Sequence, residues 1–216
     1  MHRSQTNGLA VFLHVGGWRH CHRGGGFEVQ PIVSVPKVSQ GLCGASRPGH
    51  SDGMATIINK MFNIVQPDVA VFGEKDYQQL AVIHSMVRHL NHSHQSLGEP
   101  TVRASDGLAL LCRNRYFNDQ ERAATPIPYQ CLNEMALSLQ NGHPHVERLL
   151  DEHRKRIIFA GFQLEYLEMK NAQDLAVTSE INSHLVILVT ARLAKTRLID
   201  NVVVRVNDLT ASSHRQ

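Results

Sequence analysis

A short polar segment carries the residues of this chain best suited to chemistry. Residues 73–79 read Gly-Glu-Lys-Asp-Tyr-Gln-Gln and follow the apolar run 69–72. A strand that ends in glycine and turns into a helix N-terminus forms an anion site, because free N–H groups and the positive end of the helix dipole point outward. Lys75 adds a cation to this turn, and Asp76 adds a hard oxygen ligand suited to magnesium. The alternative is an ordinary strand-to-helix turn whose charges are solvated.

Side-chain amides and a second loop supply further candidates. Gln78 and Gln79 begin the expected helix, where they could hold the hydroxyl or carboxylate oxygens of a polar substrate. The glycine- and proline-punctuated loop 42–50 carries Arg47 and His50, which could both face an anionic substrate. The open alternative for this loop is a connector in which Arg47 pairs with a surface carboxylate.

The elements expected around the polar segment alternate between helix and strand. Apolar residues recur at helical spacing in 54–65, which predicts a helix built of core residues. Residues 69–72 predict a buried strand, and 77–90 predict a helix that starts near Asp76, a residue type that caps helices well. Residues 100–103 predict the next strand. Such alternation indicates a doubly wound α/β sheet.

Less regular segments flank this unit. Residues 27–38 contain two prolines and predict an irregular segment or an edge strand. The loop 91–95 is polar, and we expect its histidines to be solvated. His20, Cys21 and His22 are adjacent, which is poor geometry for one tetrahedral metal ion, so we do not expect a metal site there.

The second half of the chain predicts helices followed by strands. Residues 105–107, Ser-Asp-Gly, predict a tight turn, and Asn118 with Glu121 has the spacing of a capping box. We expect the helix that follows to break near Pro126 and to end by Gly142. One further helix and then three strands are expected at 146–158, 163–169, 184–190 and 198–206.

Composition narrows the class of protein. The 216 residues include 42% hydrophobic and 19% charged residues, which suits a soluble globular protein. The net charge of +3 is not gathered into a basic block, so nucleic-acid binding is not indicated. Four widely spaced cysteines without a Cys-x-x-Cys pair favour a reduced protein in the cytoplasm. No apolar stretch predicts a membrane span, and we expect no signal peptide.

Three separated stretches resemble the pantothenate synthetase (pantoate–β-alanine ligase) family. They are Arg47-Pro48-Gly49-His50 with 52–56, then 63–68 running into 73–80, and 103–116. Residues 196–201, Thr-Arg-Leu-Ile-Asp-Asn, resemble the final motif of the family. The match is nearly continuous and in order from residue 36 to residue 206, which makes it far more specific than any single motif.

The resemblance implies a fold and its division. We expect an α/β protein with an incomplete Rossmann-like parallel sheet, of the class I aminoacyl-tRNA synthetase type, followed by a small α+β C-terminal domain. The expected segments are an irregular lead-in at 1–30, the remnant of the nucleotide-binding domain at 31–103, the C-terminal domain at 104–206 and a polar tail at 207–216.

The resemblance also implies an activity. Members of the family convert pantoate and ATP to pantoyl adenylate and pyrophosphate, and the amine of β-alanine then displaces AMP to give pantothenate. ATP and Mg²⁺ are the implied cofactors. Pantoate, β-alanine and ATP are the implied small-molecule substrates, with a homodimer in the cytoplasm and no nucleic-acid or membrane partner.

Site residues follow from the resemblance, motif by motif. Lys75 and Arg113 are implied to be catalytic and to contact the phosphates. Asp76 is implied to lie at the magnesium ion, and Gln79 to bind pantoate. The implied ATP-binding residues are Phe72, Gly73, Lys75, Asp76, Val102, Leu110, Leu111, Cys112 and Arg113.

Two departures from the family pattern bear on activity. Residues 1–40 contain no counterpart of the family's His-x-Gly-His signature, so we expect a member that is truncated on the N-terminal side or divergent. Residues 110–114 read Leu-Leu-Cys-Arg-Asn where the family usually shows Met-Ser-Ser-Arg-Asn, which removes two hydroxyl donors. We interpret Cys112 as a buried substitute for serine, and we expect impaired activity. The alternatives are an inactive nucleotide- or partner-binding module of the family and a gene fragment that makes no stable protein.

Overall fold

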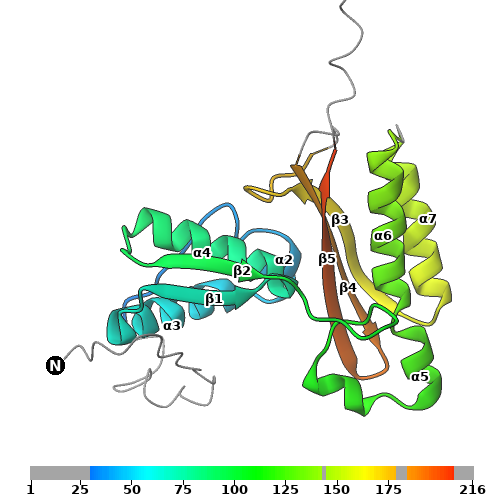
Figure 1. Cartoon of the computed structure of the whole chain (residues 1–216), viewed down its shortest axis with the longest axis horizontal. Coiled ribbons are helices and arrows are strands. Elements are labelled where there is room, and N and C mark those ends of the chain that lie inside the picture. The colour runs from blue at the N-terminus through cyan, green and yellow to red at the C-terminus, as the bar shows by residue number, and fades with distance from the viewer. Residues whose placement is uncertain (1–29, 143–144, 179–183, 207–216) are drawn as a thin grey trace, which may run out of the picture.

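The computed structural model describes residues 30–142, 145–178 and 184–206. Its elements form two units that lie side by side (Figure 1), which we call the parallel unit (residues 30–99) and the antiparallel unit (residues 100–206). They confirm the expected α/β class, although the domain boundary near residue 104 stays a prediction. The predicted lead-in up to residue 29, with His20, Cys21 and His22, and the tail at 207–216 lie outside the described residues. No helix in the described ranges is long and apolar enough to cross a membrane.

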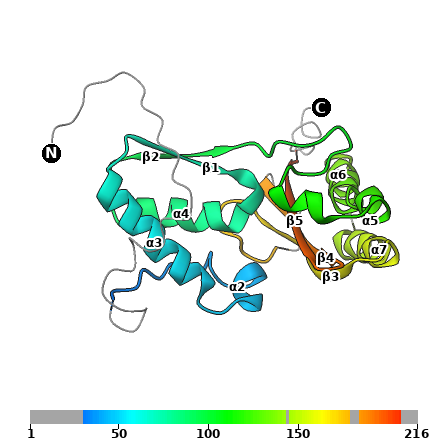
Figure 2. The same ribbon diagram turned by 90° about the horizontal axis from the view of Figure 1, so that it is seen from below.

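The parallel unit is a two-stranded sheet with helices on one face (Figure 2). Its elements are α2 (Leu42–Ser46), α3 (His50–Val65), β1 (Val69–Gly73), the 3₁₀ turn η3 (Glu74–Asp76), α4 (Tyr77–His89) and β2 (Gln95–Glu99). β1 and β2 pair in parallel, with Val71 opposite Leu97. The core of this unit includes Ala55, Phe62, Val82, Ile83 and Met86. The two predicted helices and the strand predicted at 69–72 are present, but β1 has no buried residue, so the expectation of a buried strand is wrong.

The second strand lies earlier in the chain than predicted. β2 ends at Glu99, whereas Arg103 forms only an isolated bridge with Ala109. The prediction of a strand at 100–103 is therefore wrong. The observed strand reads Gln-Ser-Leu-Gly-Glu, which carries little of the apolar signal expected of a buried parallel strand.

Close packing explains the glycine within β2. Gly98 faces α4, and a Cβ atom added there would lie 2.8 Å from Leu80 Cδ2. The strand therefore needs a small residue at this position more than it needs apolar area.

The opposite face of the parallel sheet is exposed. Val69, Val71 and Leu97 lie on this face and are 48%, 56% and 36% exposed. None of the buried clusters found in the described ranges includes these three side chains. Parallel sheets are usually covered on both faces. The parallel unit thus buries its strands on the helix side.

The structure decides one open alternative and corrects two local predictions. Residues 30–38 form no strand, so the irregular alternative is the observed one for the described part of 27–38. Leu42–Ser46 forms the short helix α2 inside the predicted loop. His94 is 8% exposed, with its ring centre 4.1 Å from that of Phe62, so the expectation of a solvated histidine is wrong at this position.

The antiparallel unit begins with a linking segment that contains the 3₁₀ turn η4 (Cys112–Tyr116). Its elements are α5 (Asp119–Ala124), α6 (Ile127–Gln140), α7 (Val146–Phe159), β3 (Gln163–Asn171), β4 (His184–Leu193) and β5 (Thr196–Arg205). The predicted capping box of Asn118 and Glu121 is present, and Pro126 separates α5 from α6. The predicted turn, helices and strands of this half are confirmed.

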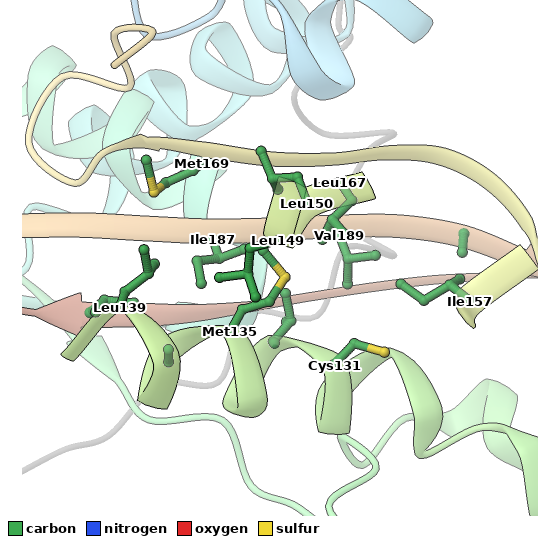
Figure 3. Packing of buried hydrophobic residues seen from close by; sticks show 14 of the residues in the cluster. Cys131, Met135, Leu139, Leu149, Leu150, Ile157, Leu167, Met169, Ile187 and Val189 are labelled. Atoms are coloured by element: carbon green, nitrogen blue, oxygen red, sulfur yellow. The ribbon is translucent and has the colours of Figure 1, made fainter. Parts of the chain in front are cut away.

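Both faces of the antiparallel sheet, ordered β3-β4-β5, are covered. The helices α6 and α7 cover one face. Figure 3 shows this core, which includes Met135, Leu139, Leu149, Ile187 and Val189. On the other face, Val186 and Leu188 of β4 pack with Leu42 of the parallel unit. Contact on both faces explains the continuous apolar sequence of β4.

The buried imidazole of His94 should make the stability of the protein depend on pH. Burial and the neighbouring His92 lower the pKa of His94 below its ordinary value. The folded protein therefore holds this imidazole neutral, whereas the unfolded chain takes up a proton as the pH falls below about 6.5. The resulting stabilisation is present above that pH and is lost as the pH falls through the folded-state pKa.

Urea denaturation at about pH 7.5 and about pH 5.5 measures this effect as a fall in the free energy of unfolding. His94→Phe keeps an aromatic ring beside Phe62, and the Nε2 atom that it removes has no hydrogen-bond partner among the described residues. The fall should therefore be smaller in the variant. An equal fall in both proteins would contradict the role assigned to His94.

Candidate functional site

A cleft of about 600 Å³, including its open mouth, lies where the two units meet. The lining residues are Cys43, Arg47, His50, Ser51, Met54, Lys75, Asp76, Tyr77, Gln78, Gln79, Val82, Tyr166, Leu188, Val189, Arg197, Ile199 and Asp200. They come from the segment around α2, from the start of α3, from η3 and α4, and from all three antiparallel strands. Basic side chains outnumber carboxylates among them, which suits an anionic ligand.

The turn between β1 and α4 contributes a charged pair to this cleft. Lys75 Nζ lies 4.0 Å from Asp76 Oδ2. Asp76 is the N-cap residue of α4, as expected, but its side chain makes no capping hydrogen bond. The carboxylate is 49% exposed and is therefore available to a ligand in the cleft.

Asp76 suits a magnesium ion that arrives with its own oxygen ligands. In the part of the chain that the structure describes, no three His, Cys, Asp or Glu side chains gather closely enough to hold a metal ion. Mg²⁺ commonly takes one or two protein carboxylates and completes its shell with phosphate oxygens and water. A single carboxylate in a basic cleft fits that mode of binding.

The two adjacent glutamines have different surroundings. Gln78 is buried: its Oε1 accepts a hydrogen bond from Cys43 N at 3.1 Å, and its Nε2 donates to Val38 O at 3.0 Å. This amide holds the backbone around α2, so the interpretation of Gln78 as a substrate ligand is wrong. Gln79 is half-buried and lines the cleft, where its amide can face a ligand.

Arg47 and His50 line the same space as Lys75. No carboxylate among the described residues pairs with Arg47, which favours the anion-binding interpretation of this loop over the connector. Burial lowers the pKa of His50, and the positive charges of Arg47 and Arg197 lower it further. His50 therefore loses its proton more readily than an ordinary histidine.

Strand β5 adds side chains to which the sequence assigns no role. Arg197 Nε lies 3.0 Å from Glu165 Oε2, and its Nη2 donates to Cys43 Sγ at 3.4 Å. Tyr166 Oη lies 3.3 Å from the same sulfur, and burial raises the pKa of Tyr166. The motif 196–201 is the signal in the sequence that could have identified Arg197. A strand there places every second side chain on the same face, so Arg197 and Ile199 share one face.

Several residues of the predicted ATP-binding set lie outside the cleft lining. The ring centre of Phe72 lies 6.2 Å from that of Phe62 on α3. Val102 and Leu110 are 70% and 56% exposed. Leu111 lines a separate cavity beneath the linking segment. The structure therefore does not gather these side chains around Lys75.

Gly73, Cys112 and Arg113 are also exposed and outside the lining. The interpretation of Cys112 as a buried substitute for serine is wrong, because η4 lies at the surface of the linking segment and buries none of its residues. The cleft thus brings Lys75, Asp76 and Gln79 together, and the contacts of the other members stay predictions.

Comparison with known proteins shows a family that this chain matches. A family model described as pantoate-beta-alanine ligase matches residues 24–203. The pantothenate synthetase of Pseudomonas savastanoi pv. phaseolicola is 53% identical over 177 residues, which cover 82% of this chain and 62% of that protein. The pantothenate synthetase of Stutzerimonas stutzeri is 54% identical over 175 residues, which cover 81% and 61%. The chain spans about three fifths of the length of these curated relatives.

Solved structures show the same similarity. The pantothenate synthetase from Thermus thermophilus matches with a TM-score of 0.74 and 36% identity, covering 80% of this chain and 63% of that one. A pantoate-beta-alanine ligase from Francisella tularensis, complexed with beta-gamma ATP and beta-alanine, matches with a TM-score of 0.61 and 26% identity. That match covers 80% of this chain and 58% of the other. These neighbours confirm the fold class.

An anion bound in the cleft should raise the pKa of His50. Its charge would offset those of Arg47 and Arg197, two of the causes that lower this pKa in the free protein. NMR titration of the histidine Cε1 protons, with and without inorganic pyrophosphate, measures the change, and His50→Gln assigns the signal.

His94 is the internal control for this titration, because it lies beside Phe62 in the core of the parallel unit and does not line the cleft. Its pKa should not move. An unchanged pKa at His50 in the presence of saturating pyrophosphate, or equal changes at both histidines, would contradict anion binding in the cleft.

Proposed function

The chain belongs to the pantoate–β-alanine ligase family, and we propose that it joins pantoate to β-alanine with ATP through a pantoyl-adenylate intermediate. The products are pantothenate, AMP and pyrophosphate. One observation carries the proposal. Lys75, Asp76 and Gln79, from a single strand-to-helix turn, line a cleft together with Arg47 and His50.

The first step needs cations at the phosphates. A carboxylate oxygen of pantoate attacks the α-phosphorus of ATP, and the bond from that phosphorus to the oxygen bridging it to the β-phosphate breaks. Both reactants are anions, so preorganised positive charge lowers the barrier. The side chain of Lys75 is only 14% exposed, so water screens its charge little. Lys75 is thus well placed to stabilise the phosphates, and Arg47 shares the same cleft.

Asp76 and Gln79 supply the polar contacts around that charge. Asp76 would hold Mg²⁺ jointly with phosphate oxygens, and the ion would neutralise the charge that develops on pyrophosphate. The amide of Gln79 would orient the hydroxyl or carboxylate oxygens of pantoate. Both residues follow Lys75 closely in sequence, so one strand-to-helix turn would present all three side chains to the cleft.

The second step completes the amide. The amine nitrogen of β-alanine attacks the acyl carbon of pantoyl adenylate, loses a proton, and displaces AMP. The leaving group is again an anionic phosphate. The basic side chains that bind ATP in the first step would therefore also stabilise the departing AMP.

The remaining contacts are proposed from the family resemblance. The adenosine would lie against the backbone of Phe72, Gly73 and Val102, and Arg113 would reach the phosphates from η4 with Leu110, Leu111 and Cys112 beside it. A homodimer is proposed on the same ground. We also propose a cytoplasmic location, which the thiols of Cys112 and Cys131, both outside any disulfide, support.

Removal of the ammonium group of Lys75 should abolish most of the activity. We expect Lys75→Ala to lower the rate of AMP formation from ATP, pantoate and β-alanine by about 100-fold or more. Lys195→Ala is the matched control, because Lys195 is an exposed lysine outside the cleft. A coupled assay for AMP measures both variants.

Two outcomes would refute this function. One is AMP formation at the same rate in Lys75→Ala as in the unmodified chain. The other is a folded chain that binds MgATP and forms no AMP when both co-substrates are present, which is the behaviour of an inactive binding module.

A further inference from the structure

The turn η3, which carries Lys75 and Asp76, has few restraints of its own. It is a single 3₁₀ turn, none of its residues is buried, and no side chain in the described part of the chain caps it. The helix α4 that follows also begins without a side-chain cap. Hydrogen-bond geometry in a 3₁₀ turn is poorer than in an α-helix. Contacts from elsewhere must therefore fix the position of Lys75.

Those contacts come from Asn201 on β5. Its Nδ2 atom donates to the main-chain oxygens of Glu74 and Lys75, both at 2.9 Å. An amide nitrogen carries two hydrogens, so this side chain uses both of its donors on one turn. Asn201 is 9% exposed, so water has little access to replace these bonds.

The position of Asn201 on the sheet directs it at the turn. It lies opposite Leu188 of β4, which packs in the junction between the two units. Its neighbour Asp200 lies opposite Val189 of β4. The main-chain N–H of Asn201 donates to Asp200 Oδ1 at 2.8 Å, which ties the two residues together.

A two-pronged ion pair anchors Asp200 in turn. Arg103 donates to Asp200 through Nη1 and Nη2 at 2.7 and 2.8 Å, and through Nη1 to Gly107 O at 3.0 Å. The guanidinium carbon of Arg103 lies 3.5 Å from the ring centre of Tyr129 on α6. Bidentate pairs of this kind are directional as well as strong. A chain of contacts therefore runs from α6, through Arg103 and β5, to the turn in the cleft.

We propose that Asn201 is a positioning residue that fixes η3 so that Lys75 and Asp76 face the cleft, and that Asp200 and Arg103 hold Asn201 in place. What Lys75 does there rests on the proposed function, whereas the hold of Asn201 on the turn is independent of it. Asn201 acts through the turn and not by contact with a substrate. Because a displacement of about 1 Å can cost about 100-fold in rate, such a restraint matters to catalysis.

Asn201→Asp tests the restraint at nearly constant side-chain size. The carboxylate has no N–H donor and would face two carbonyl oxygens. Amide hydrogen exchange, read by mass spectrometry on peptides that contain residues 73–79, should become faster in the variant. Calorimetric titration should show MgATP binding weakened by about tenfold or more.

A double-mutant cycle separates positioning from a general loss of stability. Because Asn201 acts through Lys75 as well as through Asp76, Asn201→Asp should weaken MgATP binding by a smaller factor in a Lys75→Ala background than in the unmodified chain. The matched control is Arg154→Ala, which removes another side-chain bond to a main-chain oxygen, Arg154 Nη2 to Leu167 O at 2.9 Å, between two residues outside the cleft lining. It should leave exchange at 73–79 and MgATP affinity unchanged.

The outcomes distinguish this inference from the proposed function. Unchanged exchange at 73–79 in Asn201→Asp, or the same loss of affinity in both Lys75 backgrounds, would overturn the positioning role. A chain that binds no MgATP would refute the proposed function, and the exchange result would still decide whether Asn201 holds the turn. If Asn201→Asp does not fold, Asn201→Ala removes the same donors without adding a charge, and its exchange decides the question.

Discussion

The alternation of side chains along β5 is the constraint on which the rest of the site depends. Leu198 and Val204 face the core beneath α6 and α7, whereas Arg197 and Ile199 face the cleft. Because the period of a strand is two, a shift of one residue against β4 would exchange these sets and put Arg197 into the core. The pairing of β5 with β4 therefore fixes the core and the cleft wall together.

The two units contribute unequally to that arrangement. Among the described residues, the core of the antiparallel unit contains 19 buried side chains, and that of the parallel unit contains seven. The parallel sheet also leaves Val69 and Val71 exposed on its outer face. Most of the hydrophobic stabilisation therefore lies in the antiparallel unit. Two contacts attach the smaller core to the larger one. Tyr77 Oη donates a hydrogen bond of 2.8 Å to Ala172 O, and Leu42 packs with Val186 and Leu188 of β4.

Local signals predicted much of this fold. The capping box of Asn118 and Glu121 and the break at Pro126 depend on neighbours in sequence, and both are present. β2 escaped prediction because its sequence, Gln-Ser-Leu-Gly-Glu, carries little apolar signal, and the close contact that requires Gly98 is made with Leu80 on α4. A strand needs apolar side chains only where there is room to bury them.

In the candidate site, too, residue types could be predicted from the sequence, whereas contacts between distant residues could not. The segment 73–79 was identifiable from its residue types, but the roles of Gln78 and Gln79 were not, since only the fold brings Cys43 to the amide of Gln78. Asn201 is separated from its partners on the turn by 127 and 126 residues. Such contacts depend on the packing of one unit against the other, and no local pattern in the sequence encodes them.

The central claim is that the junction between the units is an adenylate-forming cleft centred on Lys75. Chemical-shift mapping of the isotope-labelled chain with MgATP and pantoate tests it most directly. The claim predicts that the largest changes fall on residues 75–79 and on Arg47 and His50, which line the cleft from two segments. Changes confined to surfaces away from these residues, or no changes at saturating ligand in the folded chain, would contradict it.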